Sequence, residues 1–215
     1  MEIKYTSQVV LINEDGLILG VSRKDNHNDF GLIGGKGEIE DNGDPMITAI
    51  RECKEETGLD ITNLRLIFAI HKSGNMGHTY LADYTGEIEH DEPHVVKWVP
   101  FQVLINGSFG RYNQMVSESL DSMEIKYQKN INLGIIKEKL IEFVSKNKLC
   151  SNNVTVKRLI QEHDIVSGKS KMTLYLNEVS EEDLGEFDTI FIDGIRAIGN
   201  EFGVRISLPS YYYSK

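Results

Sequence analysis

The segment RECKEETGL, residues 51–59, places three glutamates and an arginine within two helical turns. Residues three and four apart on a helix are surface neighbours, so Glu52, Glu55 and Glu56 would crowd one small patch. Carboxylates this close repel one another unless a cation binds among them or solvent screens them. Oxygen ligands suit a hard divalent ion, so the pattern predicts a site for Mg²⁺ or Mn²⁺. An ordinary solvated helix face, with Arg51 as one partner of the glutamates, is the alternative.

The glutamates need a helix that positions them, and the flanking residues predict one. Asp44 can cap the free amide groups of a helix start, and proline at the next position loses no hydrogen bond. Gly58 suits the left-handed conformation that ends a helix. The expected core-facing side chains recur at spacings of three and four: Met46, Ala49, Ile50, Cys53 and Thr57. The glutamates fall largely off this stripe, free to face a cleft lined by a glycine-rich loop at residues 34–37, where backbone can approach a ligand closely.

The stretch GLIGGKGEIEDNGDPMITAIRECKEETGL resembles the signature of the Nudix hydrolases, G-x5-E-x7-R-E-U-x-E-E-x-G-U, with U an aliphatic residue. Residues that match in strict register are Gly37, Arg51, Glu52, Glu55, Glu56, Gly58 and Leu59.

Three positions depart from the signature. Cys53 replaces an aliphatic residue, and Ile33 stands where many members carry proline. Gly43 occupies the place of the first signature glutamate. An alignment on the glycine pair at residues 34–35 makes the loop two residues longer than usual. The missing acid would then be one of four: Glu38, Glu40, Asp41 or Asp44.

The resemblance implies an enzyme that hydrolyses a pyrophosphate bond in a nucleoside diphosphate linked to another group. It implies Mg²⁺ or Mn²⁺ held by Glu52, Glu55 and Glu56, with Glu55 and Arg51 also catalytic. Family members often carry an acid in the loop before a tryptophan strand, where it binds metal or activates water. Glu92 is the corresponding candidate. A solvated loop acid is the alternative.

Residues expected to contact a small nucleotide substrate are Gly35, Lys36 and Arg23, and Lys24 is a further candidate for a phosphate contact. Some subgroups carry a proline about 16 residues past the signature, associated with ADP-ribose, or a tyrosine 16 to 18 residues past it, associated with dinucleoside polyphosphates. Residues 75–77 read Asn-Met-Gly here, so neither marker is present. This favours a nucleoside triphosphate or a related modified nucleotide.

The resemblance covers about residues 3–105 and implies a mixed α/β/α sandwich, an α+β fold. Strands are expected at residues 9–12 and 17–21, as a pair around a turn, and at 64–71, 78–84 and 95–99. A helix is expected near residues 112–120. We place the first domain at residues 1–128.

Residues 129–215 are expected to form a smaller α/β accessory domain of unassigned role. A helix at 135–144 precedes strands at 172–179 and 204–208. Apolar residues between those strands repeat at helical spacing despite three glycines: Leu184, Phe187, Phe191, Ile195, Ile198 and Phe202.

Charge and composition narrow the class of protein. The net charge is −10; residues 1–128 hold 11 basic and 21 acidic residues, and residues 129–215 hold 12 of each. No basic face is evident, so nucleic-acid binding is not expected. Two cysteines without a metal or disulfide pattern favour the cytoplasm, and no segment reads as a signal peptide or membrane span. A nucleotide-sensing regulator is the alternative to an enzyme, and a homodimer is left open.

Overall fold

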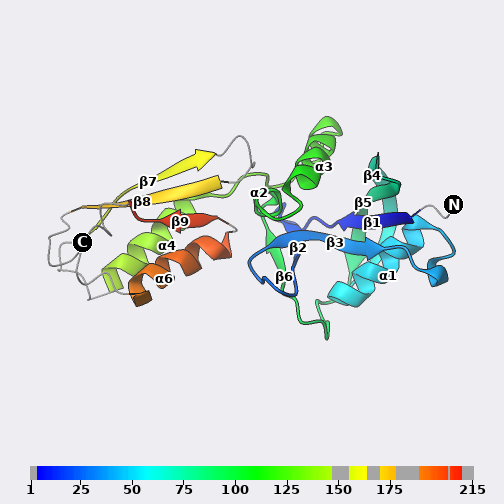
Figure 1. Cartoon of the computed structure of the whole chain (residues 1–215), viewed down its shortest axis with the longest axis horizontal. Coiled ribbons are helices and arrows are strands. Elements are labelled where there is room, and N and C mark those ends of the chain that lie inside the picture. Colours follow the sequence, from blue (N-terminus) through cyan, green and yellow to red (C-terminus); the bar gives the residue numbers. More distant parts are fainter. Residues whose placement is uncertain (1–3, 147–154, 164–169, 178–188, 203, 210–215) are drawn as a thin grey trace. The chain divides into compact units, whose positions relative to one another are not determined.

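The computed structural model describes residues 4–146, 155–163, 170–177, 189–202 and 204–209 (Figure 1). The chain divides into two compact units, residues 1–130 and 131–215. In the described part of the chain, no helix is both long enough and apolar enough to cross a membrane.

The first unit is built on a six-stranded sheet of strand order β4-β5-β1-β3-β2-β6. The central strand β1 runs antiparallel to β3 and parallel to β5. The core lies between this sheet and the first long helix, where Leu19, Ile33 and Cys53 are fully buried. The strands are β1 (Lys4–Val10), β2 (Ile18–Ser22), β3 (Phe30–Lys36), β4 (Asp60–Lys72), β5 (Asn75–Thr85) and β6 (Val96–Val99).

The expected pairing of residues 9–12 with 17–21 is wrong apart from one bridge, between Ile12 and Ile18. Strand β3 lies between β1 and β2 and pairs with both. The glycine-rich segment is therefore mostly strand, and not the expected loop. Gly34 shows why glycine is needed there: its φ is +141°, and a Cβ would lie 2.1 Å from the Ser7 carbonyl oxygen on β1. Such tight backbone pairing is open only to a residue without a side chain.

Helices lie on both sides of the sheet, as the expected α/β/α sandwich requires. Figure 1 shows α1 (Pro45–Thr57) and α3 (Gly110–Ser122) on opposite sides of the strands. Two shorter elements precede them in the chain, the 3₁₀ turn η1 (Ile39–Asp41) before α1 and α2 (Phe101–Asn106) before α3. The sequence indicated α3 and gave no signal for α2.

Helix α1 begins and ends where its flanking residues predicted. Asp44 caps it by accepting the amide hydrogen of Met46, and Gly58 ends it with φ of +77°. The expected core stripe is partly wrong, because Met46 and Ile50 are 39% and 43% exposed. The buried face instead includes Thr48. This rotation brings the face that carries the signature glutamates toward β3.

The second unit contains a three-stranded sheet of order β7-β8-β9, in which β8 and β9 are parallel. Among the described residues, Figure 1 shows α4 (Leu133–Lys146) and α6 (Thr189–Glu201) on one side of the sheet. The expected strand-helix-strand order is present as β8, α6 and β9, whereas β7 was not expected; Leu184 and Phe187 lie outside the described residues. The elements are α4 (Leu133–Lys146), β7 (Thr155–His163), β8 (Ser170–Asn177), α6 (Thr189–Glu201) and β9 (Arg205–Ser207).

Gly194 explains how α6 forms a packed helix although its apolar stripe contains glycines. A Cβ on Gly194 would lie 2.1 Å from the Phe143 ring, so its absence lets α6 approach α4. Phe143 packs on Phe191 with ring centroids 5.6 Å apart. The low helix propensity of glycine is thus offset by close helix packing.

Candidate catalytic site

Asp41 and Arg51 form the ion pair that anchors the loop before α1. Asp41 is 1% exposed, and its two carboxylate oxygens accept from Arg51 Nε and Nη2, each at 3.0 Å. The Thr48 hydroxyl and the Glu38 amide also donate to it, at 2.7 and 2.8 Å. These donors, with Arg51 first, hold the Asp41 pKa far below its usual range. Of the four acids that could replace the first signature glutamate, Asp41 is therefore the one that pairs with Arg51.

Arg51 also holds two of the three signature glutamates. Its Nη1 donates to Glu52 at 3.1 Å and to Glu55 at 3.0 Å, and its Nη2 donates to the Lys36 carbonyl at 3.0 Å. The Glu52 side chain is 14% exposed, whereas that of Glu55 is 55% exposed. Glu52 lies against β3 at Gly35, where a Cβ would come within 2.2 Å of a Glu52 oxygen. Gly35 therefore makes room for a signature carboxylate.

Glu56 is the third glutamate, and it faces the backbone of β3. Its carboxylate accepts the Gly34 amide hydrogen at 2.9 Å. Burial raises the Glu56 pKa to about 7, with repulsion from Glu52 and Glu92 adding to it. Burial likewise raises the pKa of Glu52. Two carboxylates with raised pKa values on one helix face are what a cation site needs, because a bound cation would stabilise their charged forms.

The donor set fits a hard divalent cation, because it offers only carboxylate oxygens, and those of Glu52 and Glu56 are on partly buried side chains. Among the described residues, however, no three acidic, histidine or cysteine side chains converge as a metal-binding group. Glu52 and Glu55 are turned toward the Arg51 guanidinium instead. Ligation by Glu52, Glu55 and Glu56 together therefore remains a prediction.

Glu92 lies in the loop before β6 and forms an ion pair with Lys24. The Glu92 side chain is 38% exposed and lies 4.0 Å from His94 Nδ1. His94 is buried and hydrogen-bonds the Glu56 carbonyl through Nε2 at 2.8 Å. The pair with Lys24 lowers the Glu92 pKa, which favours the charged carboxylate. The same loop thus reaches both Lys24 and α1.

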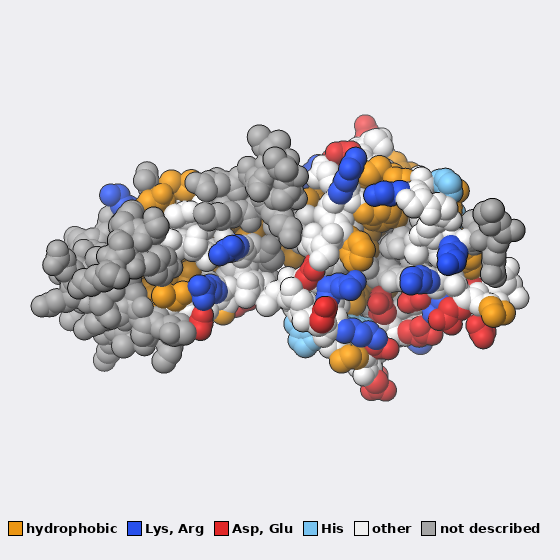
Figure 2. Space-filling model, in the orientation of Figure 1, with side chains coloured by type: hydrophobic (Ala, Val, Ile, Leu, Met, Phe, Trp, Pro, Cys, Tyr) orange, Lys and Arg blue, Asp and Glu red, His pale blue; other side chains and the backbone are white. Residues whose placement is uncertain are grey.

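A cleft of about 440 Å³ opens beside these residues. This volume suits a small ligand such as a nucleotide. Its lining includes Gly34, Glu56 and His94, and the β2–β3 connection contributes Arg23 and Lys24. The full lining is Val21, Ser22, Arg23, Lys24, Asp25, Gly31, Leu32, Gly34, Glu56, His94 and Phe109. Figure 2 shows acidic side chains gathered over the α1 side of this unit.

The structure thus brings the candidate residues together in part. Arg51, Glu52 and Glu55 are in direct contact, and Glu56 and Arg23 line the cleft. Gly35 and Lys36 are not among the residues that line it; they contact the arginine–glutamate cluster.

Sequence reasoning left open several contacts that the fold makes at the site. Asp41 was one of four candidates for the missing acid, because it stands two residues before the signature position. Gly34 provides the amide for Glu56, and Lys24 pairs with the candidate base. Phe109, at the start of α3, lines the cleft although nothing in its neighbouring sequence marks it.

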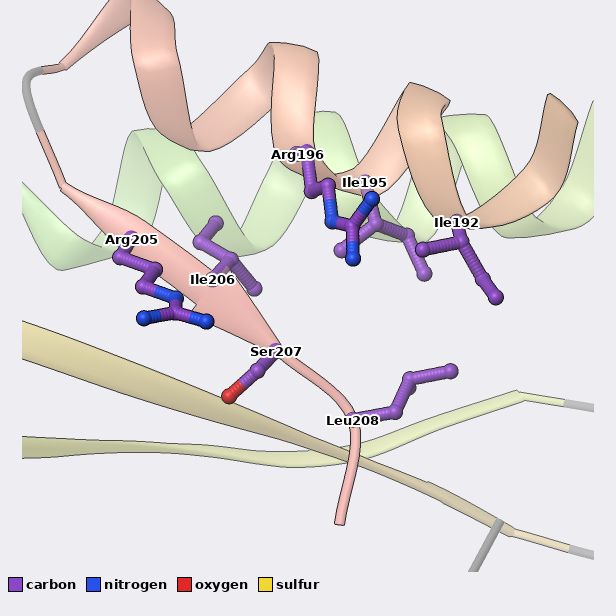
Figure 3. A pocket seen from close by; sticks show the side chains of 7 residues that line it. All are labelled: Ile192, Ile195, Arg196, Arg205, Ile206, Ser207 and Leu208. Carbon is purple, nitrogen blue, oxygen red and sulfur yellow. The ribbon is translucent and has the colours of Figure 1, made fainter. Parts of the chain in front are cut away.

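A second cavity, in the residue 131–215 unit, holds only about 30 Å³. Figure 3 shows Arg196 of α6 and Arg205 of β9 at its edge, with Ile192, Ile195 and Ile206 nearby. Its volume matches about one water molecule. It cannot accommodate a nucleotide, so the larger cleft is the candidate site.

Comparison with known proteins agrees with the signature. The NUDIX domain model matches residues 4–116, more than half of the chain. Among curated proteins, none matches. A MutT structure from Aliivibrio salmonicida or Vibrio cholerae is 20% identical, with a TM-score of 0.47, covering 55% of this chain and 98% of its own. An ADP-ribose pyrophosphatase from Streptococcus suis is 18% identical, with a TM-score of 0.48, covering 61% and 100%. A NUDIX-family hydrolase from Clostridium perfringens is 22% identical, with a TM-score of 0.43, covering 57% and 99%.

The family match spans the glycine-rich strand, the glutamate helix and the sheet that carry the cleft. It ends within α3, so it leaves residues 131–215 without an assignment. Because this model covers more than half of the sequence and the signature residues lie within it, the chain belongs to the Nudix hydrolases, a family of pyrophosphohydrolases.

Proposed function

We propose that the chain hydrolyses the pyrophosphate bond of a nucleoside triphosphate or a related modified nucleotide in the cleft beside α1. The observation that carries this proposal is that Glu56, a signature glutamate, forms part of the wall of a nucleotide-sized cleft. The absence of both subgroup markers at residues 75–77 supports a triphosphate over ADP-ribose or a dinucleoside polyphosphate.

Mg²⁺ or Mn²⁺ would be held by Glu52, Glu55 and Glu56, and when bound would neutralise phosphate charge and lower the pKa of an attacking water. Arg51 keeps the glutamates in place through its contacts with Glu52 and Glu55. These contacts hold the two carboxylates on the side of α1 that faces β3.

Glu92 is the proposed general base, because its ion pair with Lys24, which lines the cleft, places the carboxylate beside the cleft. Lys24 also interacts electrostatically with Glu56 and Glu52. It is therefore the cation placed to meet a substrate phosphate, with Glu92 beside it. The protein is proposed to act in the cytoplasm.

The decisive experiment is a hydrolysis screen with Mg²⁺ or Mn²⁺ over NTPs, dNTPs, oxidised nucleotides, ADP-ribose, NAD and dinucleoside polyphosphates. We expect turnover of at least one triphosphate. Binding of a nucleotide without turnover of any compound, by a folded protein, would favour the sensor alternative instead.

The roles of Glu56 and Glu92 can be separated by metal dependence. Glu56→Gln removes a charge while keeping the side-chain shape, so we expect turnover to fall by about 10²-fold or more, or about 2.7 kcal/mol. Raising Mn²⁺ should restore part of this loss. Glu92→Gln should also lose activity but gain nothing from added metal. Glu87→Gln, at an exposed position of the same unit, is the matched control. Wild-type turnover and metal dependence in Glu56→Gln would show that the cluster is only a solvated face.

A further inference from the structure

Phe109 is an exposed aromatic side chain at the cleft. It is 52% exposed at the N-terminal end of α3. Its ring lies over β3 at Gly31, where a Cβ would be 3.6 Å from Phe109 Cδ2. Phe109 and Gly31 both line the cleft. A large part of the aromatic surface therefore remains available to a ligand.

Arg23 lies over the same ring. Its guanidinium carbon is 5.7 Å from the ring centroid, within the range of a cation–π contact. The Arg23 side chain is 51% exposed, and its ion pair with Asp25 is long, at 3.8 Å. Such a side chain can move aside and cover the other face of a planar group. Arg23 is thus placed at the aromatic part of the cleft, whereas Lys24 interacts with the glutamates.

Asp29 fixes the positions of both residues. Its carboxylate accepts the Ser108 amide hydrogen at 2.7 Å and also accepts the Ser108 hydroxyl hydrogen. Its carbonyl accepts the Arg23 amide hydrogen at 2.8 Å. Gly107 allows this close approach, because a Cβ there would lie 2.7 Å from an Asp29 oxygen. One aspartate therefore holds the backbone beside Phe109 and beside Arg23.

We propose that Phe109 and Arg23 bind the base of the nucleotide, with the base stacked on the Phe109 ring and the Arg23 guanidinium covering it. This inference rests on the proposed function and adds the part of the site that binds the base of the nucleotide, whichever base it is. Aromatic stacking tolerates every base, because each base presents a π face. The polyphosphate would then extend toward Lys24 and Glu56, in the other part of the same cleft.

Paired ligands that share a diphosphate test this proposal without any turnover. ADP, GDP, UDP and CDP are compared with inorganic pyrophosphate, each with Mg²⁺, by isothermal titration calorimetry of the full chain. We expect at least one nucleoside diphosphate to bind more tightly than pyrophosphate. Phe109→Ala should weaken the binding of that nucleotide about tenfold or more, because it removes the ring on which the base stacks. The affinity of the Phe109→Ala variant for pyrophosphate should change less than twofold.

Further variants distinguish stacking from a general loss of structure. Phe109→Leu keeps an apolar side chain but removes the ring, and should behave as Phe109→Ala, whereas Phe109→Trp should retain binding. Phe202→Ala removes an aromatic partner of Lys139 in a separate cation–π pair and is the matched control. Asp29→Ala should weaken nucleotide binding, and adding it to Phe109→Ala should cause little extra loss.

Two results would overturn the proposal. One is that the wild-type chain binds every nucleoside diphosphate no more tightly than pyrophosphate. The other is that Phe109→Ala weakens nucleotide and pyrophosphate equally. Neither result depends on hydrolysis, so failure here is distinct from failure of the substrate screen.

Discussion

Replacing Asp41 tests whether the buried pair with Arg51 holds the loop that precedes α1. Asp41→Asn keeps the side-chain size but removes the charge that receives two hydrogen bonds from Arg51. A hydrogen bond to a charged group contributes about 1.5–3 kcal/mol, and breaking a buried pair costs about 3–5 kcal/mol. Arg51 keeps its contacts with Glu52 and Glu55. We therefore expect a loss near the lower limit, about 2–3 kcal/mol of unfolding free energy.

The single tryptophan makes this measurement specific to the first unit. Trp98 lies on β6, packs against the core and is 5.3 Å from the Tyr84 ring. Its fluorescence during urea unfolding should report on residues 1–130. A loss of 2–3 kcal/mol corresponds to a midpoint lower by about 1–1.5 M urea for a slope of about 2 kcal/mol/M, the middle of the usual range of about 1–3 kcal/mol/M.

Asp44→Ala is the matched comparison, because Asp44 is in the same loop but only caps α1. It should cost about 1 kcal/mol and leave turnover largely intact. If Asp41→Asn costs no more than Asp44→Ala, the argument for the buried pair is refuted.

The pH dependence of the Asp41 contribution has a definite sign. The folded-state pKa of Asp41 is lowered, so its contribution is present above the unfolded value of 3.8 and is lost as pH falls through the folded value. The difference in unfolding free energy between the wild type and Asp41→Asn should therefore have its full size at pH 7 and become smaller below about pH 4. A difference that stays constant over this range would contradict the ion-pair account.

Two further predictions concern other parts of the chain. Gly194→Ala should destabilise the second unit by about 1–3 kcal/mol despite the better helix propensity of alanine, because the added methyl group meets the Phe143 ring. Faster amide hydrogen exchange in α4 and α6 would show this loss of stability, and unchanged exchange would contradict it. The Cys53 thiol is buried, and its pKa is raised to about 11. In a Cys150→Ser variant, Cys53 should therefore react with a disulfide reagent at pH 8 only after the protein unfolds. Rapid reaction of the native protein would show that α1 opens readily.

Local patterns in the sequence predicted the centre of this protein well. The cap at Asp44 and the end at Gly58 set α1, since both act on backbone groups within four residues, Asp44 on the Met46 amide and Gly58 on the Lys54 carbonyl. That the glutamates would lie close together on one helix face followed from helical geometry alone. The sandwich fold came from the family resemblance, and the strand at 78–84 from composition and alternation.

Tertiary structure decided which other residues join the glutamates. The insertion of β3 between β1 and β2 depends on pairing between distant segments, which no local pattern encodes. That pairing brings Gly34 to Glu56, and the loop turn brings Asp41 to Arg51. Ser108 meets Asp29 across 79 positions of sequence, and this contact places Phe109 at the cleft. Such contacts depend on the three-dimensional path of the backbone, so residue type and spacing alone could not identify them.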